Sequence, residues 1–153
     1  MSIKKDTSHC GEFMNEWNIG VDIVEIARFQ KLDYSSNKQF YKRIFTPNEI
    51  KYCLSFNSPA PHFATNFAGK EAVFKAVNMF YNVKLHNIEI LRETNGSPYV
   101  NIHFSHEETT VPLQVKVSLS QSLSCAIAFA VAHKPTKSAN NNRKAEAVSL
   151  HEL

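Results

Sequence analysis

Residues 19–26 (IGVDIVEI) form the first strongly patterned segment of the chain, and β-branched side chains dominate it. Such a composition predicts a β-strand. Successive side chains of a strand point to opposite faces, so one face is wholly apolar and the other mixed: Ile19, Val21 and Ile23 on the first, and Gly20, Asp22 and Val24 on the second. Asp22 is thus a carboxylate inside an otherwise apolar strand.

Two helices are predicted between this strand and residue 55. The first covers residues 37–45. The second begins after Thr46, whose hydroxyl can cap a helix N-terminus, with Pro47 at the first helical position and Glu49 completing a capping box. We expect this second helix to run to about Ser55.

The clearest helical periodicity follows residues 59–61 (PAP), a segment that we expect to break the chain. From about His62 to Phe80, small and apolar side chains recur at a spacing of about 3.6 residues. They form one stripe: Gly69, Ala72, Val73, Ala76, Val77 and Phe80. Another face of the same helix carries Glu71, Lys75 and Asn78.

After residue 84 the pattern changes to that of strands. Residues 88–92 lead into Asn95 and Gly96, a dipeptide typical of a tight hairpin. Further strands are predicted for three segments: residues 99–104, 113–119 and 125–132. One strand, then helices, then a run of strands predicts an α+β domain with a largely antiparallel sheet packed against helices.

The patterned part of the chain spans residues 17–133, which we interpret as one domain. Residues 1–16 are polar and aperiodic, so we expect a loosely ordered N-terminal extension. Residues 134–153 form a polar C-terminal tail.

Composition excludes several function classes. The formal net charge of +3 is too small to indicate a nucleic-acid partner, although it suits an acidic protein partner or a polyphosphate ligand. No apolar run approaches the roughly 20 residues of a membrane span, so we expect no membrane partner. The three cysteines, Cys10, Cys53 and Cys125, are odd in number and widely spaced, which favours free thiols in a reducing cytoplasm.

Three features could carry chemistry, and each has a simpler interpretation. Asp22 could only cap a turn, and Glu71 with Lys75 could form an ordinary surface ion pair at i, i+4 spacing. The hydroxyl-rich segment 117–122 (VSLSQS) could be a plain turn between two strands.

Taken together, these features predict a magnesium site. Magnesium prefers hard oxygen ligands and usually keeps waters and substrate phosphate oxygens in its coordination sphere. A carboxylate from a strand, Asp22, and one from a helix, Glu71, would hold the ion, and the ion would bridge a pyrophosphate. Lys75, one turn after Glu71, would neutralise the charge that develops on the phosphate oxygens.

Five segments, in order and at fitting separations, resemble the acyl-carrier-protein synthase family of 4′-phosphopantetheinyl transferases. They are residues 19–28 (IGVDIVEIAR), 43–49 (RIFTPNE), 67–76 (FAGKEAVFKA), 95–99 (NGSPY) and 117–120 (VSLS). The resemblance covers residues 18–132 and implies that family's fold. Larger, pseudo-dimeric relatives carry a second acidic residue where this chain has Val24, so the chain resembles the short type.

The resemblance implies transfer of the phosphopantetheine arm of coenzyme A to a serine of an apo acyl carrier protein, with release of adenosine 3′,5′-bisphosphate. Asp22 and Glu71 match the family's magnesium ligands, and Lys75 matches a lysine that meets the coenzyme A phosphates. Arg28 and Arg43 match arginines that dock the acidic helix of the carrier. The short members are usually homotrimers with active sites between subunits.

The resemblance also implies contacts with coenzyme A from Gly96 and Pro98 of the hairpin and from Ser120 and Gln121 of the late strand. The reaction is a displacement at the β-phosphorus by a serine hydroxyl, whose proton a base must accept. Glu71, acting directly or through a water, is the leading candidate.

Three positions depart from the family pattern. Gln121 stands where a histidine is usual, Asn66 where an arginine is frequent, and Ser97 where a lysine is frequent. Glutamine can hydrogen-bond a phosphate but carries no positive charge. Two further hypotheses therefore stay open: a catalytically impaired module of the same fold that binds carrier protein or coenzyme A, and a different metal-dependent phosphotransfer or nucleotide enzyme.

Overall fold

The structure is a computed structural model, and it describes residues 17–104 and 113–135. The predicted N-terminal extension and residues 136–153 of the predicted tail lie outside the described residues. The helices are α2 (Ile26–Lys31), α3 (Lys38–Ile44), α4 (Pro47–Leu54) and α5 (Pro59–Val77), with a 3-10 turn η1 (Leu85–Asn87). The strands are β1 (Trp17–Glu25), β2 (Ile88–Arg92), β3 (Pro98–Ile102), β4 (Gln114–Gln121) and β5 (Cys125–His133).

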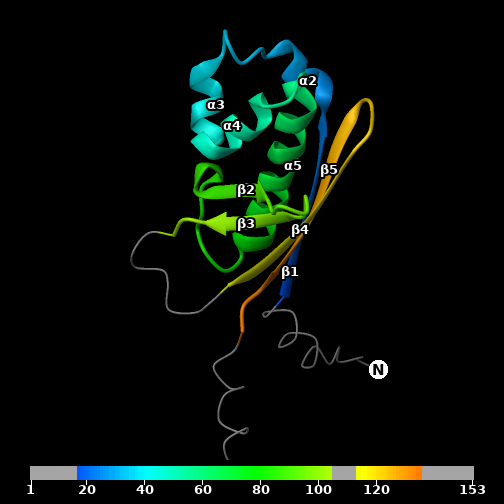
Figure 1. Cartoon of the computed structure of the whole chain (residues 1–153). Helices are drawn as coiled ribbons and strands as arrows, with labels where there is room; N and C mark the ends of the chain where they lie inside the picture. The colour runs from blue at the N-terminus through cyan, green and yellow to red at the C-terminus, as the bar shows by residue number, and fades with distance from the viewer. Residues whose placement is uncertain (1–16, 105–112, 136–153) are drawn as a thin grey trace, which may run out of the picture.

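The fold is α+β, as predicted, and every strand pair in the described residues is antiparallel. Strands β1, β5 and β4 form a sheet in that order, and β2 and β3 form a separate hairpin beside β4. Figure 1 shows the long helix α5 running along one face of the sheet, with α3 and α4 beside its N-terminal half. The predicted hairpin turn is confirmed, and Gly96 adopts a φ of 86°, which favours glycine.

The face of β1 that α5 covers is the mixed one. A Cβ on Gly20 would lie 2.0 Å from the carbonyl oxygen of Ala72 and 2.9 Å from the backbone nitrogen of Ala76, so strand and helix backbones are in direct contact there. Strand β5 contributes only alanines to this interface: Ala126, Ala128, Ala130 and Ala132, all buried. Small residues on both elements therefore bring β1 close to α5, which decides what Asp22 can reach.

The opposite face of the sheet is apolar and exposed. Ile19 is 63% exposed and Ile23 is 66% exposed, although both are β-branched core formers by type. The register of β1 and β5 places Val21 beside Phe129 and Ile23 beside Ile127. The exposed apolar face consists of Trp17, Ile19, Val21, Ile23, Ile127 and Phe129.

The predicted start of α4 is confirmed in detail. The Thr46 hydroxyl accepts a hydrogen bond from the backbone N–H of Glu49, and the Glu49 carboxylate accepts one from the backbone N–H of Thr46. Pro47 occupies the first helical turn. This reciprocal arrangement also turns the Glu49 side chain into the protein, where it is 0% exposed.

The prediction for the start of the long helix was wrong. Residues 59–61 do not break the chain, because α5 begins at Pro59 and both prolines lie in its first turn. The N–H groups of a first turn have no partner within the helix, so proline is tolerated there. The helix also ends earlier than predicted, at Val77 rather than Phe80. Helix α2 was not predicted.

An aromatic cluster ties α2 and α3 to α5. The Phe29 ring of α2 lies 5.7 Å from the Phe67 ring of α5 and 6.1 Å from the Tyr41 ring of α3, centroid to centroid. Tyr41 in turn meets Phe63 at 4.5 Å in an edge-on contact. The cluster fixes the short helix α2, and therefore Arg28, against the middle of α5. No helix in the described part of the chain is long and apolar enough to cross a membrane.

Candidate active site

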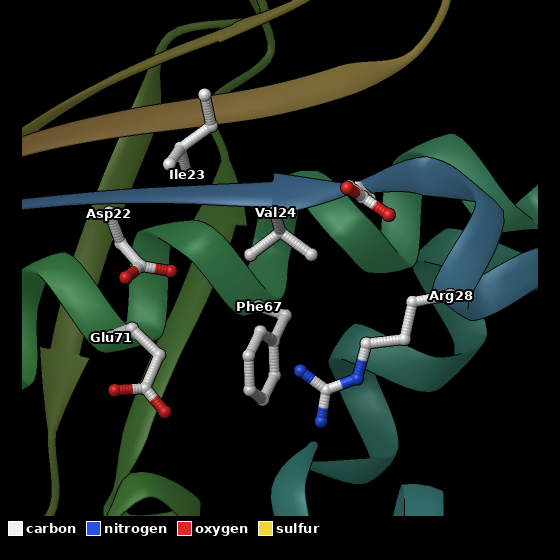
Figure 2. A pocket seen from close by; sticks show the side chains of 7 residues that line it. Asp22, Ile23, Val24, Arg28, Phe67 and Glu71 are labelled. Carbon is white, nitrogen blue, oxygen red and sulfur yellow. The ribbon is translucent and has the colours of Figure 1, made fainter.

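Asp22 and Glu71 line one pocket between β1, α2 and α5. The pocket has a volume of about 500 Å³, and its lining is Asp22, Ile23, Val24, Glu25, Arg28, Phe67 and Glu71. Asp22 lies two residues after Gly20 on the same face of β1, so the close approach of Gly20 to Ala72 brings the neighbouring carboxylates together. Figure 2 shows the Asp22 side chain pointing from β1 toward α5, and the Glu71 carboxylate on the far side of it, directed into the pocket and away from Asp22.

The electrostatics of Glu71 reflect this convergence. Burial raises the pKa of the Glu71 carboxyl above its usual value, and the Asp22 carboxylate raises it further, while Lys75 and Arg28 act in the opposite direction. Both upward causes disfavour a negative charge on Glu71, burial by removing water from the carboxylate and Asp22 by repulsion. Such a site favours an added cation.

Lys75 contacts the strand carboxylate rather than the helix carboxylate. Its Nζ donates hydrogen bonds to Asp22 Oδ1 at 2.8 Å and to the carbonyl oxygen of Val21 at 2.9 Å. The simpler interpretation, a surface ion pair between Glu71 and Lys75, is therefore wrong for the described residues, in which the carboxylate that pairs with Lys75 is Asp22. The Lys75 side chain stays 48% exposed, which leaves it free to move to another anion.

The donor set fits magnesium and does not fit a metal held by protein alone. In the described ranges, no group of three or more His, Cys, Asp or Glu side chains could hold an ion. Asp22 and Glu71 offer two carboxylates, hard oxygen donors in a pocket with room for waters and a phosphate. Magnesium characteristically takes one or two carboxylates and completes its octahedron with waters and substrate oxygens.

Lys70, the residue before Glu71, belongs to a different part of the molecule. Its Nζ lies 2.6 Å from Glu49 Oε2, both side chains are 0% exposed, and it also donates to the carbonyl oxygen of Ile88. Glu49 Oε1 accepts a further hydrogen bond from the backbone N–H of Ile90 at 3.0 Å. Lys70 therefore fixes α5 to α4 and β2 and offers no contact to a ligand in the pocket.

The two arginines expected to dock a carrier protein differ in their surroundings. Arg28 lines the pocket, and its guanidinium carbon lies 5.1 Å from the centre of the Phe67 ring. Arg43 is exposed in the last turn of α3 and does not line the pocket. Phe67 and Glu25 also line the pocket, and sequence reasoning assigned neither of them a role. The signal that could have found Phe67 is an aromatic residue four positions before Glu71, on the same helix face.

The residues expected to contact coenzyme A from the late strand point in opposite directions. Gln121 Oε1 accepts a hydrogen bond from the Thr65 hydroxyl at 2.7 Å, on the side of the sheet that α5 covers. Ser120 faces the other side, opposite Ile127, and lies on the same face as the exposed apolar residues. Asn66 is 0% exposed and bonded to Ile90 and Arg92, so it is a structural residue in this chain.

The hairpin with Gly96 and Pro98 is also remote from Asp22 within one chain. Asp22 lies on β1, one edge of the sheet, whereas the hairpin lies beside β4, the other edge. None of Gly96, Pro98, Ser120 and Gln121 lines the pocket of Asp22 and Glu71. A single chain thus brings together Asp22, Glu71, Lys75 and Arg28 and leaves the other predicted contacts on separate surfaces.

The solved structures most informative for comparison are bacterial. The crystal structure of holo-[acyl-carrier-protein] synthase from Neisseria meningitidis superposes with a TM-score of 0.65 at 31% identity, covering 76% of this chain and 98% of that one. The holo-[acyl-carrier-protein] synthase of Helicobacter pylori, solved in complex with coenzyme A, gives a TM-score of 0.61 at 28% identity, covering 76% and 99%.

Sequence comparison gives the same group. A holo-[acyl-carrier-protein] synthase of Protochlamydia amoebophila is 39% identical over 115 residues, covering 74% of this chain and 94% of the relative. One of Thermodesulfovibrio yellowstonii is 36% identical over 113 residues, covering 74% and 95%. The family model of the 4′-phosphopantetheinyl transferase superfamily matches residues 18–128. The chain belongs to this superfamily and, within it, to the holo-[acyl-carrier-protein] synthase group.

Proposed function

We propose that the protein transfers the 4′-phosphopantetheine group of coenzyme A to a serine of an apo acyl carrier protein, in a magnesium-dependent reaction that releases adenosine 3′,5′-bisphosphate. The observation that carries this proposal is the convergence of Asp22 and Glu71 in one pocket beside Lys75. The relatives named holo-[acyl-carrier-protein] synthase, one of them solved with coenzyme A, support the reaction and the donor.

The chemistry assigns a task to each side chain. The serine oxygen of the carrier attacks the β-phosphorus of coenzyme A, a new P–O bond forms, and the bond from that phosphorus to the bridging oxygen breaks. The bridging oxygen leaves with adenosine 3′,5′-bisphosphate. Glu71 takes the serine proton, directly or through a water.

Charge neutralisation supplies the rest of the acceleration. Asp22 and Glu71 would hold magnesium, which would supply positive charge to the pyrophosphate of coenzyme A. Lys75 leaves Asp22 when that carboxylate has another cation and turns to the phosphate. Positioning and charge stabilisation of this kind account for most of the rate in phosphoryl transfer.

The protein works as a homotrimer with sites between subunits. Two observations support this part of the proposal: the predicted coenzyme A contacts lie at the edge of the sheet opposite Asp22, and the exposed apolar face needs a cover. Head-to-tail packing that covers the apolar face and brings one copy's β1 beside the next copy's β4 would close a ring and complete each site. Light scattering should give three times the chain mass; a fully active monomer would contradict this arrangement.

The acidic carrier docks beside the pocket, where Arg28 is exposed, with Arg43 as a second contact. The thiols of the described part of the chain, Cys53 and Cys125, are free, which agrees with work in the cytoplasm.

The test is incubation of the protein with coenzyme A, magnesium and each of several apo carriers of fatty-acid or polyketide synthesis, followed by mass spectrometry of the carrier. We expect a gain of one phosphopantetheine mass, lost when magnesium is chelated. Tight binding of carrier or coenzyme A with no mass gain on any carrier would instead support the impaired module. A nucleotide that raises the melting temperature more than coenzyme A does would support a different phosphotransfer enzyme.

A further inference from the structure

The Arg28 side chain stacks on an aromatic ring at the edge of an acidic pocket. Its guanidinium carbon lies 5.1 Å from the centre of the Phe67 ring, within the range of a cation–π contact. Phe67 precedes Glu71 by four residues on α5, so the ring and the carboxylate are neighbours on one helix face. Figure 2 shows the Phe67 ring between the Glu71 carboxylate and the Arg28 guanidinium.

Arg28 is not paired with the carboxylates of the pocket. Asp22, Glu25 and Glu71 all line the same pocket, and a guanidinium forms its strongest hydrogen bonds with carboxylates. In the residues that the structure describes, however, the Arg28 side chain has no hydrogen bond or ion pair, and its guanidinium lies over the Phe67 ring instead. The aromatic contact therefore holds it in place of a salt bridge.

The ring itself is firmly held. Phe67 is 7% exposed and lies 5.7 Å from the Phe29 ring and 6.5 Å from the Phe45 ring, centroid to centroid. Phe29 belongs to α2, the helix that also carries Arg28. The backbone that carries the arginine and the ring beneath its guanidinium thus form one packed unit.

We propose that Phe67 is a positioning residue: its ring holds the Arg28 guanidinium at the rim of the pocket and separates it from Glu71. This inference rests on the proposed function. Two consequences follow. The carboxylates of Asp22 and Glu71 stay available to a divalent cation, and the donors of Arg28 stay available to an acidic segment of the carrier.

The test compares Phe67→Leu with Phe63→Leu. Phe63 lies one turn earlier on α5, is 1% exposed and packs in the same cluster, but Arg28 stacks on Phe67 and not on it. Both changes remove a ring and keep apolar bulk. We expect Phe67→Leu to weaken the binding of Mn²⁺, used as a probe for magnesium and followed by calorimetry, by about fivefold, the scale of one cation–π contact. Phe63→Leu should leave Mn²⁺ affinity unchanged.

A second change decides whether Phe67 acts through Arg28. Arg28→Gln in the Phe67→Leu background should restore the Mn²⁺ affinity, because the cation that competes for the carboxylates is gone. Phe67→Tyr keeps the ring face and should behave as the unmodified protein. In the transfer assay, Phe67→Leu should raise KM for the carrier by about fivefold with a smaller change in KM for coenzyme A.

The outcomes separate the two proposals. Equal Mn²⁺ affinities in Phe67→Leu and Phe63→Leu would overturn the role of Phe67, even if the protein transfers phosphopantetheine. So would a failure of Arg28→Gln to restore the Mn²⁺ affinity of Phe67→Leu. Failure of the unmodified protein to modify any carrier overturns the proposed function, and the Mn²⁺ titrations still decide the role of Phe67. If Phe67→Leu does not fold, Phe67→Met with the same titration replaces it.

Discussion

Lys70 and Glu71 are neighbours in α5, yet they belong to two ionic clusters of opposite character. The first cluster, Lys70 with Glu49, is 0% exposed on both sides and is bonded to the backbone of β2. The second, Glu71 with Asp22 and Lys75, opens into a pocket, and the Lys75 and Asp22 side chains are 48% and 18% exposed.

The difference lies in how completely each cluster satisfies its own charges. The Glu49 carboxylate accepts hydrogen bonds from Lys70, from the Ile90 backbone and from the Thr46 backbone, so no donor or acceptor remains for a ligand. In the pocket, burial and then the Asp22 carboxylate raise the pKa of Glu71 although Lys75 is near. The buried cluster therefore stabilises the fold. The open cluster holds two carboxylates whose negative charges a bound cation would stabilise.

The largest expected effect comes from removing the open carboxylates. Glu71→Gln and Asp22→Asn should each lower turnover by about 10²–10⁴-fold or more, the scale of a lost base or charge stabiliser, because each removes one ligand of the cation. Their circular dichroism should match that of the unmodified protein. Full activity of both variants in the carrier mass assay would remove the metal assignment.

The next effect tests the buried cluster. Lys70→Met should destabilise the protein by about 3–5 kcal/mol, because it leaves the Glu49 carboxylate buried without its cation. The measurement is urea unfolding, and the control is the double variant Lys70→Met with Glu49→Gln, which should lose less than Lys70→Met alone. A loss below about 1 kcal/mol for Lys70→Met would mean that the pair is not needed for the fold.

A smaller effect tests the close packing that joins β1 to α5. Gly20→Ala places a Cβ 2.0 Å from the Ala72 carbonyl oxygen, so the strand must move away from the helix. We expect a loss of about 1–3 kcal/mol and weaker Mn²⁺ binding, since Asp22 moves with the strand. Mn²⁺ affinity equal to that of the unmodified protein would contradict the account.

The smallest effect concerns the charge of Glu71, which burial and the neighbouring Asp22 carboxylate both disfavour. The raised pKa of Glu71 means that the folded state favours the protonated form, so stability falls as pH rises from the usual glutamate range through the raised pKa. At neutral pH without divalent cations, Glu71→Gln should therefore be more stable by about 0.2–0.5 kcal/mol. The gain should disappear at low pH in thermal melts. A Glu71→Gln variant less stable than the unmodified protein at neutral pH would contradict this prediction.

Local sequence signals predicted much of the fold. The Thr46 capping box, the turn at Gly96 and the periodicity of α5 depend on neighbours within a few residues, and each is confirmed. The prolines of residues 59–61 misled the prediction, because the same residue type both ends helices and begins them.

The parts that sequence did not predict depend on tertiary contacts. The sequence does not show which of the adjacent charged residues Lys70 and Glu71 is buried. Only the packing of α4 and β2 against α5 places the Lys70 side chain beside Glu49, 21 residues away in the chain. The stacking of Arg28 on Phe67 needs α2, a helix too short to show a period. The mixed face of β1 is buried because Gly20 lets the strand contact the α5 backbone at Ala72. The β-branched composition of the strand does not show which of its faces is buried.

The most direct test of the central claim is a crystal structure grown with Mn²⁺ and coenzyme A, in which anomalous scattering locates the cation. We predict a single peak within about 2.0–2.3 Å of a carboxylate oxygen of Asp22 and one of Glu71, with pyrophosphate oxygens completing the coordination. A cation bound elsewhere, or these two carboxylates too far apart to share it, would contradict the account.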